Sequence, residues 1–387
     1  MKVVFISNYF NHHQQPFSEA MYNLIGDDYA FIETAVISRE RLALGWGVHD
    51  KPSYVKQNFL SEADQKQCQA LIDEADVVIY GSAPYSLLTK RLNDGKLTMK
   101  YSERLYKKGC PFYKLPWHFI LNTKKYRRYK NLYILCASAY TAADFAKTFT
   151  FINKAYKWGY FPKTHRYDSV DALMQQKKPT TVLWVARFID LKHPEYVIEV
   201  ARRLKTENLD FQIQMVGNGP LWDMIAQQIK EFGLQDQVQL IGAVPADQVR
   251  KYMDDAAIFL FTSDRNEGWG AVLNESMNSG CAVVASDAIG AVPFLVKDGE
   301  NGLCYKRCDV DDLYNKVKYL LEHAEYRNAI GRKAYETITT LWNAETAAQR
   351  FVHLCEKFLR GEKRPDLYED GPCSKAPIMK ETKLRKI

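Results

Sequence analysis

Residues 257–280 read AIFLFTSDRNEGWGAVLNESMNSG, and this stretch decides the fold. Its first five residues are all apolar, which is typical of a strand buried on both faces of a parallel sheet. A loop containing Gly268 and Gly270 follows, and residues 271–278 favour a helix. Strand, glycine-containing loop and helix in this order predict an α/β unit. The loop would lie at the carboxyl end of the strand, where open parallel sheets bind ligands.

The same alternation of short apolar runs and longer amphipathic stretches extends along the whole chain. Residues 77–80, VVIY, are another continuous apolar run, and residues 194–204 carry apolar side chains at helical spacing. This alternation predicts an α/β protein with doubly wound parallel sheets. The expected strands are residues 3–7, 32–38, 77–81, 97–101 and 132–138, then 181–187, 211–217, 238–242, 257–263 and 282–286.

The chain divides into two Rossmann-like halves, because the strand–helix pattern restarts near residue 180. Its 387 residues are also more than one core usually organises. Before the restart lies a stretch rich in Lys, Gln and Asp that has no apolar period. The expected parts are an N-terminal domain over 1–162, a linker over 163–179, a C-terminal domain over 180–342, an amphipathic helix over 343–360 and a loosely held charged tail over 361–387.

The composition excludes several classes of protein. Hydrophobic residues make up 47% and charged residues 26%, which is the balance of a globular chain and not of a disordered one. The sequence contains no run of about 18 apolar residues, so no transmembrane helix is predicted. The apolar run Val3–Ile6 is too short for a signal peptide, so we expect a cytoplasmic protein. The eight cysteines are scattered without a CxxC pair, which argues against a zinc site.

Positive charge is concentrated in residues 90–130, which hold 13 lysines and arginines against Asp94 and Glu103. Aromatic residues are interleaved with these cations. Basic and aromatic side chains together suit an anionic membrane surface, such as the inner face of the plasma membrane. A nucleic acid would also accept such a patch, although we expect no nucleic-acid partner. The alternative interpretation is an ordinary solvated surface.

Two cations follow the strand expected at 181–187. The sequence there continues as ARFIDLKHPE and supplies Arg187 and Lys192. Cations at the mouth of a strand, just before a helix, suit a diphosphate, because charge-assisted hydrogen bonds to it are strong. The alternative is a pair of ordinary surface cations. Neither half has GxGxxG after its first strand, which argues against a dinucleotide fingerprint.

Two carboxylates, Glu267 and Glu275, stand eight residues apart in the loop and helix of residues 263–280. Free N–H groups at the helix start, around Gly270 and Ala271, can hold a phosphate. A carboxylate further along can accept both hydroxyls of a ribose. The alternative is an acidic first turn stabilised by the helix dipole, which would explain one glutamate but not the glycine-containing turn.

Taken in order, these segments resemble the donor half of a retaining glycosyltransferase of family 4, with the GT-B fold. The resemblance rests on R-x4-K, VGNGP at 216–220, E-x7-E and SDAIGAVPFLVKDGENG at 286–302. It covers residues 180–345, and it covers 1–178 only in layout. The family implies two Rossmann-like domains facing a central cleft, with the helix over 343–360 crossing back to the N-terminal domain.

The resemblance also implies roles for individual residues. Arg187 and Lys192 would neutralise the diphosphate of a nucleotide sugar, Glu275 would bind its ribose, and Glu267 would contact or orient the donor sugar. No metal or other cofactor is expected, because the family generally works without one. Donor contacts through the backbone are expected from Gly219 and from Gly268, Trp269, Gly270 and Ala271.

The N-terminal half departs from the family pattern. Residues 8–16, NYFNHHQQP, contain no glycine where many relatives have a glycine-rich loop, so His12 and His13 become candidates for substrate contact. Glu103 falls near the position of a histidine that many relatives carry. It is a candidate for acceptor or donor-sugar contact, or else a local partner of nearby cations: Arg104, Lys107 and Lys108.

One metal-like motif is better explained as a helix cap. Asp309-Val310-Asp311 precedes a helical stretch, where Asp309 suits the N-cap position and Asp312 the third position of the helix. We therefore expect no metal there.

The predicted reaction moves a hexose-type sugar from a nucleoside-diphosphate sugar to an acceptor hydroxyl with retention. The expected acceptor is a saccharide, and a lipid-linked one in bacterial surface polysaccharide synthesis is favoured because of the basic stretch. A different class of protein would be a non-catalytic nucleotide-sugar-binding or membrane-associated scaffold on a transferase fold.

Overall fold

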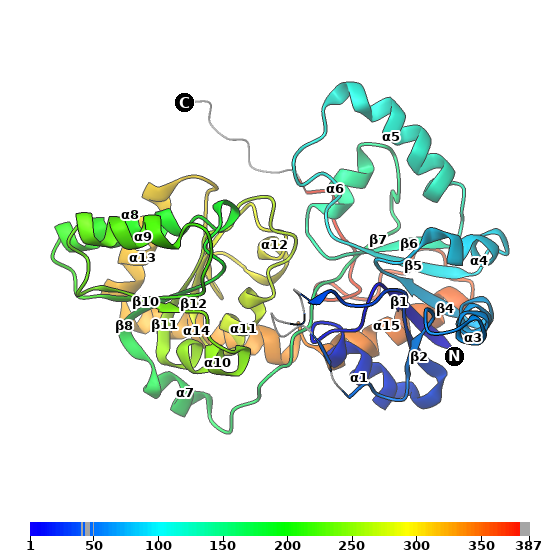
Figure 1. The fold of residues 1–387 in the computed structure, drawn as a ribbon, viewed down its shortest axis with the longest axis horizontal. Coiled ribbons are helices and arrows are strands. Elements are labelled where there is room, and N and C mark those ends of the chain that lie inside the picture. Colours follow the sequence, from blue (N-terminus) through cyan, green and yellow to red (C-terminus); the bar gives the residue numbers. More distant parts are fainter. Residues whose placement is uncertain (40–41, 43–46, 49, 380–387) are drawn as a thin grey trace. The chain divides into compact units, whose positions relative to one another are not determined.

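The structure is a computed structural model that describes residues 1–39, 42, 47–48 and 50–379. The chain forms two compact units (Figure 1). Among the described residues, one unit contains Met1–Lys163 together with residues 343–379, and the other contains Thr164–Trp342. Each unit is described by itself.

Within the described residues, the first unit is built on a seven-stranded sheet in which every pair of neighbours is parallel. All five residues of β1 (Val3–Ser7) and all four of the central strand β4 (Val77–Tyr80) are buried, because helices cover both faces of a parallel sheet. In spatial order the strands are β3 (Val55–Gln57), β2 (Tyr29–Glu33), β1 (Val3–Ser7), β4 (Val77–Tyr80), β5 (Leu97–Ser102), β6 (Leu132–Cys136) and β7 (Ala155–Lys157).

Helices of the first unit begin where side chains satisfy their free N–H groups. The Ser61 hydroxyl accepts from the N–H of Asp64 at 3.1 Å, and the Asn343 side chain accepts from the N–H of Thr346 at 2.8 Å. The helix that Asn343 caps packs against the first helix of the chain. The helices are α1 (Gln15–Ile25), α3 (Glu62–Glu74), α4 (Thr89–Asn93), α5 (Leu115–Asn122), α6 (Thr141–Ala146) and α15 (Ala344–Leu359).

The second unit, within the described residues, has a six-stranded parallel sheet whose chain order reverses at its centre. In spatial order the strands are β10 (Val238–Gly242), β9 (Gln212–Val216), β8 (Lys178–Val185), β11 (Ala256–Phe261), β12 (Ala282–Ser286) and β13 (Leu303–Tyr305). The reversal lies between β8 and β11. Ligands of open α/β sheets bind at such a switch point.

Helices on both faces of this sheet complete the second unit. The predicted cap is confirmed, since the Asp309 carboxylate accepts from the N–H of Asp312 at 2.9 Å at the start of a helix. The helices are α7 (Val170–Gln176), α8 (Pro194–Thr206), α9 (Trp222–Glu231), α10 (Ala246–Asp255), α11 (Val272–Asn278), α12 (Val292–Leu295), α13 (Val310–Glu322) and α14 (Ala324–Thr340).

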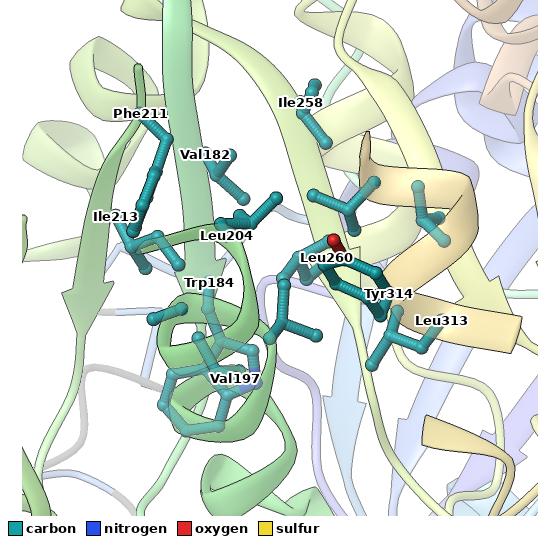
Figure 2. Packing of buried hydrophobic residues seen from close by; sticks show 14 of the residues in the cluster. Val182, Trp184, Val197, Leu204, Phe211, Ile213, Ile258, Leu260, Leu313 and Tyr314 are labelled. Atoms are coloured by element: carbon teal, nitrogen blue, oxygen red, sulfur yellow. The ribbon is translucent and has the colours of Figure 1, made fainter. Parts of the chain in front are cut away.

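A single apolar cluster joins strands and helices in the second unit. Figure 2 shows Trp184 of β8 and Leu260 of β11 beside Val197 of α8 and Leu313 of α13. These four side chains are almost completely buried. The core therefore fixes the positions of β8 and β11, and with them the loops at the carboxyl ends of both strands.

The structure differs from the expectation at three short elements and at β2, which spans Tyr29–Glu33 where a strand over 32–38 was expected. The three-residue strands β3 and β7 were not expected, because they are too short to show a pattern. Helix α7 lies inside the predicted linker, where Ser169 caps it and Leu173 and Met174 are buried beside Tyr335. Two apolar side chains are enough to anchor a helix this short.

The expectation of a loosely held tail from residue 361 is wrong for its middle part. Cys373 and Ser374 are buried, and the Ser374 carbonyl accepts from the N–H of Lys157 at 2.7 Å. Lys375 forms an antiparallel bridge with Tyr156. The tail covers the open edge of β7, which would otherwise expose unpaired backbone groups. Residues 380–387 of the predicted tail lie outside the described residues.

The basic and aromatic stretch 90–130 is only partly at the surface. Tyr106, Tyr126 and Tyr129 are buried, and so is Arg91, whose guanidinium donates to backbone carbonyls that include Ile72 and Ala75. These side chains build the unit and do not form an exposed patch. The exposed apolar side chains gather around α5 instead: Phe112, Tyr113, Trp117, Ile120 and Leu121.

The described helices differ from membrane-spanning segments. None of them is both long enough and apolar enough to span a membrane.

The shared core makes a prediction about stability. Replacing the buried Leu260 by Ala should lower the unfolding free energy of the second unit by about 2–5 kcal/mol, because the cavity left behind adds to the lost burial. Met224→Ala on α9 is the control, since Met224 is 39% exposed and should change stability by less than about 0.5 kcal/mol. Urea unfolding measures both, and equal effects would contradict the packing described.

Candidate functional site

Three loops of the second unit meet at the carboxyl edge of its sheet. They follow β8, β9 and β11, which are neighbours or next neighbours in the sheet. The N–H of Phe188 donates to the Asn218 carbonyl at 2.9 Å, and the N–H of Asp264 donates to the Leu191 carbonyl at 2.9 Å. These bonds tie the loop after β8 to the other two loops. The candidate residues on the three loops are therefore held near one another.

An ion pair between Lys192 and Glu267 lies at the centre of this edge. Lys192 ends a short 3-10 helix over Asp190–Lys192, and its ammonium contacts a carboxylate oxygen of Glu267. The side chains are 14% and 15% exposed, so the pair is only thinly solvated. The Lys192 ammonium also lies 5.9 Å from the centre of the Phe261 ring. The structure thus joins two of the residues that the sequence analysis singled out.

The glycine loop before α11 is shaped by close packing. Gly270 has φ of +84°, and a Cβ on it would lie 2.2 Å from the Phe261 ring, so only glycine fits. Trp269 beside it is buried, and its indole N–H donates to the Asn274 side-chain oxygen at 2.8 Å. The Trp269 side chain therefore anchors the loop, and only its backbone remains for a ligand.

Glu275 stands in the first turn of α11, one helical turn beyond this loop. Burial raises the pKa of its carboxyl, and the positive charge of Arg250 on α10 offsets this only in part. Arg250 also donates to the Glu275 carbonyl at 3.0 Å and to the Ser279 hydroxyl at 2.9 Å. The first N–H groups of α11 have no acceptor within the helix itself. Hydrogen-bond donors and a carboxylate are thus presented close together.

Arg187 and Gly219 occupy the other two loops. Arg187 follows β8 and is exposed. Gly219 packs against the same loop, because a Cβ there would lie 2.6 Å from the Phe188 carbonyl oxygen. Its smallness therefore has a structural reason within the protein, independent of any ligand.

His193 was not singled out from the sequence, although it follows Lys192 directly. Its backbone is left-handed, with φ of +48°, just before Pro194 begins α8. Its Nδ1 lies 2.7 Å from Glu195 and its Nε2 lies 3.8 Å from Asp264. Burial alone would lower the pKa of His193, but the carboxylates of Glu195, Asp264 and Asp190 outweigh burial and raise it. The protonated form of this imidazole, which lies next to Lys192 in the chain, is thus favoured relative to a free histidine.

The candidates of the first unit gather around Tyr160, which the sequence analysis missed. The Tyr160 hydroxyl donates to a carboxylate oxygen of Glu103 at 2.6 Å, and Lys107 pairs with the other oxygen at 2.6 Å. The ring centres of His12 and His13 lie 3.9 Å apart with the ring planes tilted by 48°, and the His13 ring centre lies 5.5 Å from that of Tyr160. Burial and the neighbouring His12 lower the pKa of His13 to about 3, so this imidazole is neutral near pH 7.

Glu103 therefore has the local cationic partner that was one of its two interpretations. Contact with an acceptor remains a prediction. No sequence signal marks Tyr160, because it reaches Glu103 from 57 residues away.

The described residues were expected to hold no metal ion. Within them, no three His, Cys, Asp or Glu side chains form a group that could hold an ion.

Most of the second unit is similar to a known protein family. Residues 168–337 match the family described as "Glycosyl transferases group 1". This region of the chain is similar to the group 1 glycosyl transferases, and the match spans less than half of the chain. The predicted strand, glycine loop and E-x7-E segment all lie inside the matched region.

Curated relatives of this part of the chain come mainly from bacteria. A 4-alpha-N-acetylgalactosaminyltransferase of Campylobacter jejuni is 32% identical over 157 residues, which are 41% of this chain and 41% of the relative. The putative colanic acid biosynthesis glycosyltransferase WcaL of Salmonella typhimurium is 26% identical over 46% of this chain and 45% of its own length. The chain thus matches less than half the length of these relatives.

Solved structures extend the similarity to the whole chain. HepE of Anabaena, determined in complex with UDP, has a TM-score of 0.66 and 16% identity over 92% of this chain and all of its own. A sucrose-phosphate synthase of Thermosynechococcus elongatus has a TM-score of 0.63 and 14% identity over 94% of this chain and all of its own. At such identities the likeness concerns the fold, and it confirms the predicted GT-B class.

The packing of Gly270 makes a prediction with an internal control. Gly242 has nearly the same φ, +86° against +84°, but no described atom lies within 4 Å of a Cβ built on it. Gly242→Ala should cost about 1–2 kcal/mol of unfolding free energy for its left-handed backbone alone. Gly270→Ala should cost about 1–3 kcal/mol more, because its methyl group meets the Phe261 ring. Equal losses in urea unfolding would contradict the close contact.

The environment of Glu275 predicts that a neutral side chain at this position makes the folded protein more stable, but only at high pH. Because burial raises its pKa, the ionised carboxylate costs folding free energy above that raised pKa. The cost disappears as the pH falls below the ordinary glutamate pKa of about 4.3. Glu275→Gln should therefore raise the melting temperature at pH 8 but not at pH 4.

Melting curves at both pH values test this prediction. The exposed Glu231→Gln on α9 serves as the control and should behave like the wild type. If Glu275→Gln melts at a lower temperature than the wild type at pH 8, burial of the ionised Glu275 carboxylate does not destabilise the fold, and the prediction is wrong.

Proposed function

We propose that this protein is a retaining glycosyltransferase that moves a hexose-type sugar from a nucleoside-diphosphate sugar to an acceptor hydroxyl. The observation that carries the proposal is the thinly solvated Lys192–Glu267 pair at the switch point of the second unit. A cation held by one carboxylate at the mouth of the sheet is ready to neutralise phosphate charge. Exposed Arg187 on the same loop supplies a second cation.

The donor would be held by groups that the second unit already positions. Lys192, Arg187 and the first N–H groups of α11 would bind the diphosphate, and Glu275 would accept hydrogen bonds from the ribose hydroxyls. Glu267, fixed by Lys192, would contact the donor sugar. HepE, which shares the fold, has been determined with UDP, and this supports a uridine nucleotide as the first donor to test.

The transfer step needs no side-chain base. The bond between the sugar C1 and the β-phosphate oxygen breaks, and the acceptor oxygen forms a new bond to C1 on the same face. The acceptor proton passes to the departing β-phosphate oxygen. Fixed cations stabilise the negative charge that grows on this phosphate in the transition state. Because Arg187 and Lys192 supply the positive charge, we propose that no metal ion is required.

The acceptor is proposed to be a lipid-linked saccharide of bacterial surface polysaccharide synthesis. The name of the Campylobacter jejuni relative contains diphospho-undecaprenol, and WcaL is named for colanic acid biosynthesis. These names describe the relatives and support the same class of acceptor here.

An anionic membrane surface is proposed as the partner of the region around α5. Figure 1 shows α5 standing away from the sheet of the first unit, and Phe112, Tyr113 and Trp117 are 83%, 67% and 62% exposed. The exposed side chains of Lys108, Lys114 and Lys124 lie along the same segment. Each lysine near an anionic bilayer contributes roughly 1 kcal/mol, and aromatic rings favour the interface. This would keep the enzyme beside a lipid-linked acceptor.

The donor proposal predicts stabilisation by one class of nucleotide sugar without metal. In a panel of UDP-, GDP- and ADP-sugars with EDTA, a donor at 100 times its dissociation constant should stabilise the wild type by about 2.7 kcal/mol. Arg187→Gln should weaken this response, because it removes one charge-assisted contact. Arg202→Gln on α8, where the arginine pairs with Glu199 instead, should respond like the wild type.

Thermal melting of the full chain measures these responses. If no nucleotide sugar shifts the melting temperature while lipid vesicles or nucleic acid do, the non-catalytic scaffold becomes the better interpretation.

The membrane proposal predicts a loss of vesicle binding in a double variant. Phe112→Ala combined with Trp117→Ala should reduce sedimentation with phosphatidylglycerol vesicles, because it removes two large aromatic side chains that are strongly exposed in this region. Phe232→Ala in the second unit, where Phe232 is 42% exposed, is the control and should sediment like the wild type. Unchanged sedimentation of the double variant would exclude α5 as the membrane contact.

A further inference from the structure

A cavity of about 590 Å³ lies beyond the edge strand β7 of the first unit. Its walls come from α6, from residues 151–155 and from the C-terminal segment that pairs with β7 (Figure 1). Phe151, Ile152 and Ile378 give it apolar sides, and Ile378 is 58% exposed in the described chain. The volume falls within the range of small-molecule sites.

Positive charge gathers at this cavity. Arg364 and Lys375 line it, against a single carboxylate, Asp366. Within the part of the chain that the structure describes, the Arg364 guanidinium has no hydrogen-bond or ion-pair partner, and its backbone is left-handed with φ of +59°. The Lys375 ammonium donates to the Tyr156 hydroxyl at 2.7 Å and to the Arg364 carbonyl at 3.0 Å. Burial and the nearby Arg364 lower the pKa of Lys375, although Asp366 opposes this.

A third cation, Lys154, lies behind the cavity wall. Its ammonium donates to the carbonyls of Tyr129 and Lys130 at 3.1 and 2.6 Å. Burial lowers the pKa of Lys154, and the charge of Arg364 lowers it further. Three cations near one carboxylate repel one another, and an anion in the cavity would relieve that repulsion.

The cavity borders the segment that continues from α5. Its wall residue Phe151 packs on Tyr126 with ring centres 5.5 Å apart, and Tyr126 belongs to the π-helical turn Thr123–Arg127 that directly follows α5. The cavity is also separate from the candidate acceptor loops. Its residues Asn153 and Ala155 stand at the amino end of β7, whereas Glu103 follows the carboxyl end of β5.

We propose that this cavity binds a single anionic amphiphile, namely an organic phosphate that carries an apolar chain. Arg364, with Lys375, would bind the phosphate, and Phe151, Ile152 and Ile378 would contact the chain. The source we infer is the headgroup of an anionic membrane lipid, and in this respect the inference rests on the proposed membrane contact of α5. The cavity would bind one anionic lipid molecule specifically. The exposed side chains around α5 would contact the bilayer surface without selecting a single lipid.

Calorimetric titration of the full chain with short-chain, monomeric lipids tests the site without a bilayer. Dihexanoyl phosphatidylglycerol should bind at least about tenfold more tightly than either dihexanoyl phosphatidylcholine or inorganic phosphate. Arg364→Asn, which removes the charge and tolerates the left-handed backbone, should weaken phosphatidylglycerol about tenfold. Arg360→Asn at the end of α15 is the matched control, since its side chain is 69% exposed and should not matter.

Several outcomes would overturn the proposal. If dihexanoyl phosphatidylglycerol binds the Arg364→Asn variant as tightly as it binds the wild type, the cavity is excluded as the lipid-binding site. If inorganic phosphate binds as tightly as the lipid, the apolar chain makes no contribution to binding. The ligand of the cavity would then be free phosphate. A second variant, Ala376→Phe, fills the cavity without changing its charge and should also abolish binding.

The lipid site in the cavity can be tested separately from the membrane contact of α5 and from the transferase function. The Phe112→Ala and Trp117→Ala double variant should bind the monomeric lipid normally, because it alters only the surface around α5. Arg364→Asn should keep the full thermal response to nucleotide sugars. A wild type that binds the lipid but no nucleotide sugar would contradict the proposed transferase and leave the cavity site intact.

Discussion

The parallel pairing of β8 with β11 is the constraint on which the candidate site depends. Val182 pairs with Ile258 and Leu183 with Phe259, although about 75 residues separate the two strands in the chain. Because both strands run in the same direction, the loops that follow them meet at one edge of the sheet. Lys192 from one loop therefore reaches Glu267 from the other. The buried side chains that Figure 2 shows hold this pairing in place, so the core and the site share one cause.

Much of the fold could be predicted from the sequence, because continuous apolar runs mark strands that are buried on both faces. Strands β1, β10 and β12 have the expected bounds, and α11 begins within one residue of its expected start. The apolar pattern is lost where an element is very short, as in the three-residue strands β3 and β7. Residues 155–157 are too few to show a pattern, and the C-terminal segment that covers them is charged in composition. Its order comes from backbone pairing with β7, which composition does not encode.

The candidate site was predictable where its residues lie close in sequence and much less where they meet across the fold. Glu267, Gly270 and Glu275 belong to one strand, loop and helix, so their spacing alone indicated their placement. Tyr160 and Glu103 meet only through tertiary structure, and no local pattern marks Tyr160. The exposure of cationic side chains in residues 90–130 could not be predicted for a related reason. Arg91 is buried because backbone carbonyls surround its guanidinium, and charge counted along the chain cannot separate such a residue from an exposed one.

The central claim is that the loops after β8 and β11 hold the diphosphate of a nucleotide-sugar donor. The most direct test is a crystal structure of the full chain with the nucleoside diphosphate that stabilises it most. The account predicts diphosphate oxygens within hydrogen-bond distance of Lys192 or Arg187, and ribose hydroxyls on the Glu275 carboxylate. A nucleotide bound with its diphosphate away from both cations, or with its ribose away from Glu275, would contradict the claim.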